Sequence, residues 1–129
     1  MDMQMPEIYC AVKLVFDKDI NIDAVIEKLN KIGINEFRIK RPKYEKAVCI
    51  ILDGVKYERL WYLDEALNIM FSHIDDKLIQ IRDIVDCFHG EVILDISFWH
   101  YESYPALVFS HENINKIHLL NASISIDPY

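Results

Sequence analysis

Apolar residues recur along this chain with two different periods, and these periods predict where its strands and helices lie. In residues 91–101 the side chains alternate between two sides, with Val92, Leu94, Ile96 and Phe98 on one and Asp95, Ser97, Trp99 and Tyr101 on the other. Successive side chains of a strand point to opposite faces of its sheet, so this pattern predicts a strand with one buried face. Residues 8–16 have one wholly apolar side and one of mixed character, and residues 122–127 alternate with Ile124 and Ile126 expected to face inward.

Apolar spacings of three and four residues predict the helices. The first covers residues 22–32, where Asn21 is a suitable N-cap and Gly33 a suitable left-handed stop. A short helix is expected after Ser110, ending at Asn121. Its inward positions are Ile114, Ile117 and Leu120.

The longest helical pattern covers residues 64–89, with Asp64 as the expected N-cap and Gly90 as the expected stop. Its apolar positions are Leu67, Met70, Phe71, Ile74, Leu78, Ile81, Val85 and Phe88. Cap-type residues between positions 72 and 76 predict a break within this pattern, because they favour helix ends over helix interiors.

Turn chemistry predicts the connections between the strands. Asp53 and Gly54 stand between two strand-like runs, residues 47–52 and 55–61. An Asp-Gly pair suits a type I′ turn, which needs positive φ at both central positions, so a β-hairpin is expected here. A short charged strand at 37–41 precedes the hairpin, and a turn at 102–103 is expected to lead into a strand at 104–109.

These elements predict a single α+β domain spanning residues 1–129. We expect a mainly antiparallel β-sheet with the helices packed on one face. Two strand–helix–strand units would then surround a central hairpin and the long broken helix.

Composition narrows the class of protein. The chain has 129 residues, of which 52% are hydrophobic and 27% charged, as expected for one globular domain. The N-terminal sequence lacks the basic and apolar regions of a secretory signal, and no apolar run approaches the length of a membrane span. Cys10, Cys49 and Cys87 are odd in number and widely spaced, which favours free thiols in a reducing compartment. We therefore expect a cytoplasmic protein that does not contact a membrane.

Charge is distributed unevenly along the chain. The net charge of −7 argues against a nucleic-acid partner, whose phosphates would be repelled. The basic cluster between Arg38 and Lys46 is either a solvated edge or a site for phosphate or an acidic partner. The acidic stretch from Asp75 to Asp95, which includes Asp76 and Asp83, suits a protein partner with positive charge.

Residues 63–129 resemble the bacterial domain-of-unknown-function family 4279. The shared features are the helical stretch with a break in it, the alternating strand, a segment that begins at Pro105 and opens a helix, and the ending Asn121-Ala-Ser-Ile-Ser-Ile-Asp-Pro-Tyr. The resemblance implies a fold and a bacterial origin. It implies no catalytic residue, because no activity is established for that family.

The sequence contains no recognisable motif for catalysis or for metal binding. Each of the three glycines is explained by a turn or a helix stop, so no phosphate-binding loop is predicted. His111 and His118 are seven residues apart, about 10 Å along a helix, which is too far for one metal ion. We therefore predict no cofactor, no metal and no catalytic residue.

The polar side of the strand at 91–101 is the main candidate for a binding surface. Asp95, Trp99 and Tyr101 fall on it, and Trp and Tyr are favoured contact residues at interfaces. The alternative is an ordinary solvated sheet face.

The sequence thus favours a small bacterial interaction domain without catalytic activity. The most specific version of this hypothesis is an immunity-type protein that binds a cationic partner through an acidic surface that includes Asp76 and Asp83. The alternative is a small-molecule-binding protein or an enzyme that uses the polar face around Asp95, Trp99 and Tyr101. Self-association into a homo-oligomer is a third interpretation.

Overall fold

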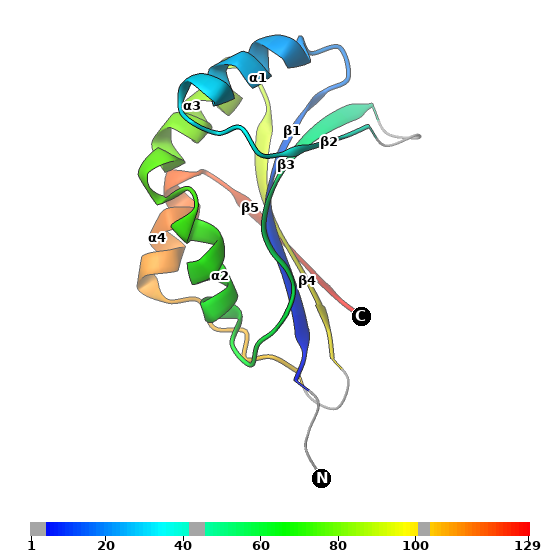
Figure 1. Ribbon diagram of the computed structural model, residues 1–129, viewed down its shortest axis with the longest axis vertical. Helices are drawn as coiled ribbons and strands as arrows, with labels where there is room; N and C mark the ends of the chain where they lie inside the picture. The colour runs from blue at the N-terminus through cyan, green and yellow to red at the C-terminus, as the bar shows by residue number, and fades with distance from the viewer. Residues whose placement is uncertain (1–4, 42–45, 101–103) are drawn as a thin grey trace.

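The computed structural model describes residues 5–41, 46–100 and 104–129, and Figure 1 shows a single sheet with helices along one side. The fold class is therefore α+β, as predicted. In chain order the elements are β1 (Glu7–Asp17), α1 (Ile22–Lys31), β2 (Arg38–Lys40), β3 (Ala47–Arg59), α2 (Leu63–Ser72), the short 3-10 helix η1 (Asp75–Lys77), α3 (Leu78–Cys87), β4 (Glu91–Trp99), α4 (His111–Leu119) and β5 (Ser123–Pro128).

The sheet has the strand order β2-β3-β1-β4-β5. The first four of these strands pair antiparallel, while β5 runs parallel to β4. A parallel neighbour cannot be reached through a tight turn, and α4 provides the crossover that it needs. The sheet is mostly antiparallel, which confirms the prediction.

The core lies between the sheet and the helices (Figure 1). Alternate side chains of the interior strands β1 and β4 are buried there, which confirms the inward faces expected for both. They are Ile8, Cys10, Val12 and Leu14 from β1, and Val92, Leu94, Ile96 and Phe98 from β4. From the helices, Leu67, Phe71 and Ile81 are fully buried against them. The opposite face of the sheet is left without a helix in the part of the chain that the structure describes.

The predicted hairpin at Asp53-Gly54 is wrong, because β3 is one continuous strand of 13 residues. The pairing of β1 with β3 shifts twice, at Ile8/Cys10 and at Cys10/Ala11, and each shift leaves an extra residue on β3. Gly54 is the extra residue of the second shift, between the partners of Cys10 and Ala11. A Cβ atom there would lie only 2.1 Å from Cγ of Met70. Glycine is thus needed for the close approach of α2 to the sheet, not for a turn.

Helix ends are partly as predicted. The Asn21 side chain accepts a hydrogen bond from the Ala24 N–H at 3.2 Å, and Gly33 has φ +89°, so both ends of α1 are confirmed. The expected break in the long helical region is the segment Asp75–Lys77 between α2 and α3. Asp64, however, does not cap α2, because Tyr62 occupies the N-cap position.

At the other end of this helical region, the left-handed residue is His89 (φ +56°) and not Gly90. Gly90 has a different constraint. A Cβ atom on it would lie 2.5 Å from the Phe16 ring. The predicted role of Gly90 as the stop is therefore wrong, since α3 ends at Cys87 and Phe88 is its C-cap.

The C-terminal part differs most from expectation. Ser110 does cap α4, since its hydroxyl accepts a hydrogen bond from the Asn113 N–H, and Asn121 has the expected positive φ. Between residues 104 and 109 there is no strand but an isolated bridge from Ala106 to Tyr62. Tyr101 and the turn at 102–103 lie outside the described residues.

The burial expected of Ile124 and Ile126 from their inward positions is wrong, since both side chains are exposed, and so is that of Ile114 in α4. In register, Ile124 and Ile126 pair with the buried Leu94 and Ile96 of β4. They are therefore on the helix side of the sheet, but α2 packs on β3 and β1 and α3 packs on β4. The edge strand β5 is left uncovered, so its apolar side chains remain in solvent.

Candidate functional site

The candidate site is the face of the sheet opposite the helices, here called the helix-free face. Strand register places Asp53, Ala11, Asp95 and Ser125 side by side across four strands of it. Tyr9, Ser97 and Asp127 form the next row. These side chains come from segments far apart in sequence, and the antiparallel pairing brings them together.

Arg38, Asp53 and Tyr9 form a hydrogen-bonded network on this face. The Arg38 guanidinium donates from Nε to Asp53 Oδ2 at 2.6 Å and from Nη2 to Asp53 Oδ1 at 2.8 Å. The Tyr9 hydroxyl donates to Asp53 Oδ1 at 3.1 Å and accepts from Arg38 Nη2 at 3.3 Å. A bidentate pair of this kind fixes the orientation of both side chains.

The network separates the pKa values of its two acids. Burial raises the pKa of Tyr9, and the neighbouring Asp53 carboxylate raises it further, so the phenol keeps its proton. Burial alone would raise the pKa of Asp53, but hydrogen bonds from Arg38 and Tyr9 outweigh this and the pKa is lowered. Asp53 is thus an anion and Tyr9 a neutral donor at physiological pH.

Asp95 lies at the centre of the helix-free face and already has a partner. Its carboxylate forms an ion pair with Lys13 Nζ at 2.8 Å, and only 9% of the residue is exposed. Its charge is therefore largely compensated before any ligand arrives. The same ion pair holds Lys13 in place on the face.

Four aromatic side chains, here called the aromatic row, cross one end of this face: Tyr9, Tyr57, Trp99 and Tyr129. The ring centroids of Tyr9 and Tyr57 are 5.8 Å apart, and Tyr57 meets Trp99 edge-on at 5.0 Å. Trp99 stacks on Tyr129 at 4.8 Å. Tyr57 is 54% exposed and Tyr129 61% exposed, so the row is open to solvent along much of its length.

The backbone of Tyr57 is strained. Its φ is +55°, a conformation that a large side chain rarely adopts. Strained residues of this kind are concentrated at functional sites, where the surrounding structure holds them in place. Here the strain occurs at the first register shift of β3, and it leaves the ring between those of Tyr9 and Trp99.

A shallow cavity of about 460 Å³ lies on this face. Its lining residues are Tyr9, Lys13, Arg38, Lys40, Ile51, Lys56, Tyr57, Asp95, Ser97, Trp99 and Tyr129. The helix-free face is therefore hollowed and lined by cations and aromatic rings.

The structure places the predicted site residues in two separate regions. Asp95 and Trp99 lie together on the helix-free face, while Tyr101 is outside the described residues. Asp76 and Asp83 are exposed in the helical layer, in η1 and α3. The acidic stretch from 75 to 95 therefore does not form one surface.

Several residues of this face were missed from sequence. Tyr9 occupies a polar-side position of β1 that the alternation does mark, and Arg38 belongs to the basic cluster. Tyr57 and Tyr129 carry no local signal that would place them beside Trp99. Their meeting depends on strand pairing between distant segments.

Metal-binding clusters and membrane-spanning helices are both absent from the described ranges. No group of three or more His, Cys, Asp or Glu side chains there is arranged to hold a metal ion. No helix in the same part of the chain has the length and apolarity needed to cross a membrane. Cys10 is a buried free thiol whose pKa is raised to about 12 by burial, so it is not reactive, and Cys87 is exposed.

No family model, no curated protein and no solved structure matches this chain. The resemblance of residues 63–129 to family 4279 therefore stays a prediction.

Proposed function

We propose that this chain is a non-catalytic protein-interaction domain that binds its partner with the helix-free face. The observation that carries the proposal is the aromatic row, which stands open to solvent beside the Arg38–Asp53–Tyr9 network. Trp, Tyr and Arg are the residue types that dominate binding energy at protein interfaces. This face presents all three within one hollow.

The side chains of this face are held in place before binding. Arg38 is fixed by two hydrogen bonds to Asp53, and Trp99 is packed between Tyr57 and Tyr129. Side chains that are already ordered lose little conformational entropy when a partner arrives. The face is thus suited to binding a folded partner without rearrangement.

The pKa directions support a role without catalysis. A general acid or base works best when its pKa lies near the working pH. On this face the pKa of Asp53 is lowered and that of Tyr9 is raised, so both move away from neutrality. Neither group is prepared to exchange a proton with a substrate.

In a second form, we propose that the domain is a cytoplasmic, immunity-type bacterial protein that binds a cationic partner through an acidic surface that includes Asp76 and Asp83, because the cation-lined helix-free face would repel such a partner. The net charge of −7 supports this form, because it would attract a basic protein over long range. The exposed carboxylates of Asp76 and Asp83 on the helical side would contribute to that attraction. A gene for a large toxin-like protein directly upstream is the expected genomic context, and an isolated gene would contradict this form.

The contact face itself is tested with aromatic variants. Immobilised wild-type protein is expected to retain a stoichiometric partner from a lysate of its own source. Trp99→Ala and Tyr129→Ala should each lose it, because they remove stacked rings of the row. Tyr62→Ala is the matched control, since Tyr62 is 55% exposed at the start of α2 and outside the row. Retention by both row variants would refute the proposed face.

A second function is supported by the cavity of about 460 Å³, whose size falls in the range of small-molecule sites. Under this alternative the helix-free face binds a small ligand between Lys13, Arg38 and Trp99. A thermal-shift screen over metabolites tests it, because a ligand at 100 times its dissociation constant adds about 2.7 kcal/mol of stability. No shift across a broad panel would eliminate this alternative.

A further inference from the structure

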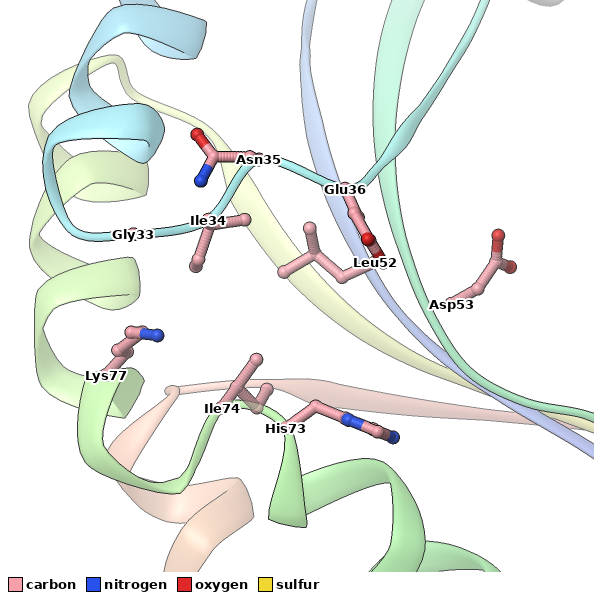
Figure 2. Close-up of a pocket in the computed structure, with 9 residues that line it drawn as sticks. All are labelled: Gly33, Ile34, Asn35, Glu36, Leu52, Asp53, His73, Ile74 and Lys77. Atoms are coloured by element: carbon pink, nitrogen blue, oxygen red, sulfur yellow. The ribbon is translucent and has the colours of Figure 1, made fainter.

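A second cavity, of about 530 Å³, lies on the other side of the sheet, at its β3 edge. Figure 2 shows it between the loop after α1, strand β3 and the junction of α2 with η1. Its lining residues are Gly33, Ile34, Asn35, Glu36, Leu52, Asp53, His73, Ile74 and Lys77. We call it the loop cavity, and its volume is typical of a small-molecule site.

The middle of the loop cavity is apolar. Ile34, Leu52 and Ile74 all lie between its polar groups in Figure 2, and each belongs to the buried core. Because these side chains are fixed by the core, the apolar surface exists before a ligand binds. It suits a ligand whose body is a hydrocarbon chain or ring.

Lys77 supplies the charge of the cavity. Figure 2 shows its ammonium directed into the space below Ile34. The stem crosses Gly33 so closely that a Cβ atom there would lie 3.4 Å from Lys77 Nζ. The ammonium has no hydrogen bond or ion pair with any residue that the structure describes. A half-buried cation beside apolar walls therefore keeps its donors free for an anion.

The other ionisable groups of the cavity restrict the anion. The Asp53 carboxylate points away from the cavity in Figure 2 and is bound by Arg38. Glu36 and His73 are both exposed, and Glu36 lies across the apolar middle from Lys77 in Figure 2. A second negative charge on the ligand would meet Glu36 and be repelled. The cavity thus suits a single carboxylate.

We propose that the loop cavity binds a small organic monocarboxylate with an apolar body. The carboxylate contacts Lys77 Nζ, and the body lies on Ile34, Leu52 and Ile74. This site is on the opposite side of the sheet from the helix-free face, so it does not depend on the function proposed above.

The test is a titration followed by amide NMR, with phenylacetate and hexanoate as probes and their neutral amides, phenylacetamide and hexanamide, as controls. Both carboxylates are expected to shift the amide signals of residues 33–36 and 73–77, and the neutral amides should bind at least about tenfold more weakly. Lys77→Met removes the ammonium and keeps most of the stem, and it should weaken carboxylate binding at least about tenfold. Lys28→Met is the matched control, because this exposed lysine of α1 is outside the cavity and carries the same charge.

Two results would overturn the proposal. One is the absence of shifts at these residues with either carboxylate up to about 10 mM, a concentration that detects even millimolar affinity. The other is equal carboxylate binding by Lys77→Met and the wild type, with circular dichroism confirming that the variant is folded.

Discussion

Gly54 provides the strongest test of how β3 and α2 fit together. An added Cβ would lie 2.1 Å from Cγ, 2.5 Å from Cβ and 3.0 Å from Cα of Met70. Rotation of the Met70 side chain can move Cγ away but leaves its Cα and Cβ in place. Gly54→Ala must therefore push α2 off the sheet, and α2 carries the buried side chains of Leu67 and Phe71.

The expected cost lies at the upper end of the range for overpacking, about 3 kcal/mol of unfolding free energy. Unfolding entropy of about 2.1 cal/mol/K per residue gives about 0.27 kcal/mol/K for 129 residues. The same change should therefore lower the melting temperature by about 10 °C. Urea unfolding followed by far-UV circular dichroism measures the first quantity, and a thermal scan measures the second.

A second substitution, Gly54→Asn, distinguishes the continuous bulged strand β3 from the hairpin that the sequence predicted. In a type I′ turn, asparagine would tolerate the positive φ of this position better than alanine does. In the structure the larger Asn side chain meets Met70, so Gly54→Asn should be less stable than Gly54→Ala. A Gly54→Asn protein as stable as Gly54→Ala, or a loss below about 0.5 kcal/mol for either, would refute this account of the β3–α2 contact.

Three further predictions concern separate parts of the fold. Because the pKa of Asp53 is lowered from 3.8, its contribution to stability is present above that pH and is lost as the pH falls through the folded-state value. The stability difference between wild type and Asp53→Asn should therefore be largest near neutral pH and shrink in acid, and a constant difference in pH-dependent urea unfolding would contradict this. Asn113 is fully buried and its amide donates to the Asp64 carboxylate at 2.8 Å. Asn113→Asp should therefore cost about 3 kcal/mol of unfolding free energy, measured by urea unfolding. Asn115→Asp is the control, because Asn115 is exposed, and it should change stability by less than about 0.5 kcal/mol. Ile96→Ala should cost about 3 kcal/mol and Ile124→Ala less than about 1 kcal/mol, since Ile96 is fully buried and Ile124 is 46% exposed; equal losses would show that β5 is covered.

Local sequence patterns correctly predicted the features that depend only on neighbouring residues or on one buried face. The alternation in β1 and β4 marks their buried faces because both strands lie in the middle of the sheet, under the helices. The ends of α1 follow from Asn21 and Gly33, whose effects are confined to one turn. For the same reason the sequence places Asp95 and Trp99 together on the polar side of their strand, although it does not show whether that side is covered.

Long-range packing decided the features that the sequence could not reveal. The alternation of β5 is the same as that of a covered strand, yet Ile124 is exposed because the helices end over β4. Asp64 looks like an N-cap, but its carboxylate instead accepts hydrogen bonds from Ser110 and Asn113, 46 and 49 residues away. In both cases the partner that matters is distant in sequence.

The register shifts in β3 connect the largest error in the predicted fold with the candidate site. Gly54 and Val55 are consecutive, yet both face the helices. A side chain on Gly54 would touch Met70 of α2, and the Val55 side chain is buried in the core. Lys56 and Tyr57, also consecutive, both line the hollow of the helix-free face. A regular strand would send one residue of each pair to the wrong side. The shifts therefore deliver the Tyr57 ring to Trp99 while they let α2 approach the sheet. Substitutions at Gly54 should accordingly disturb the aromatic row as well as the core.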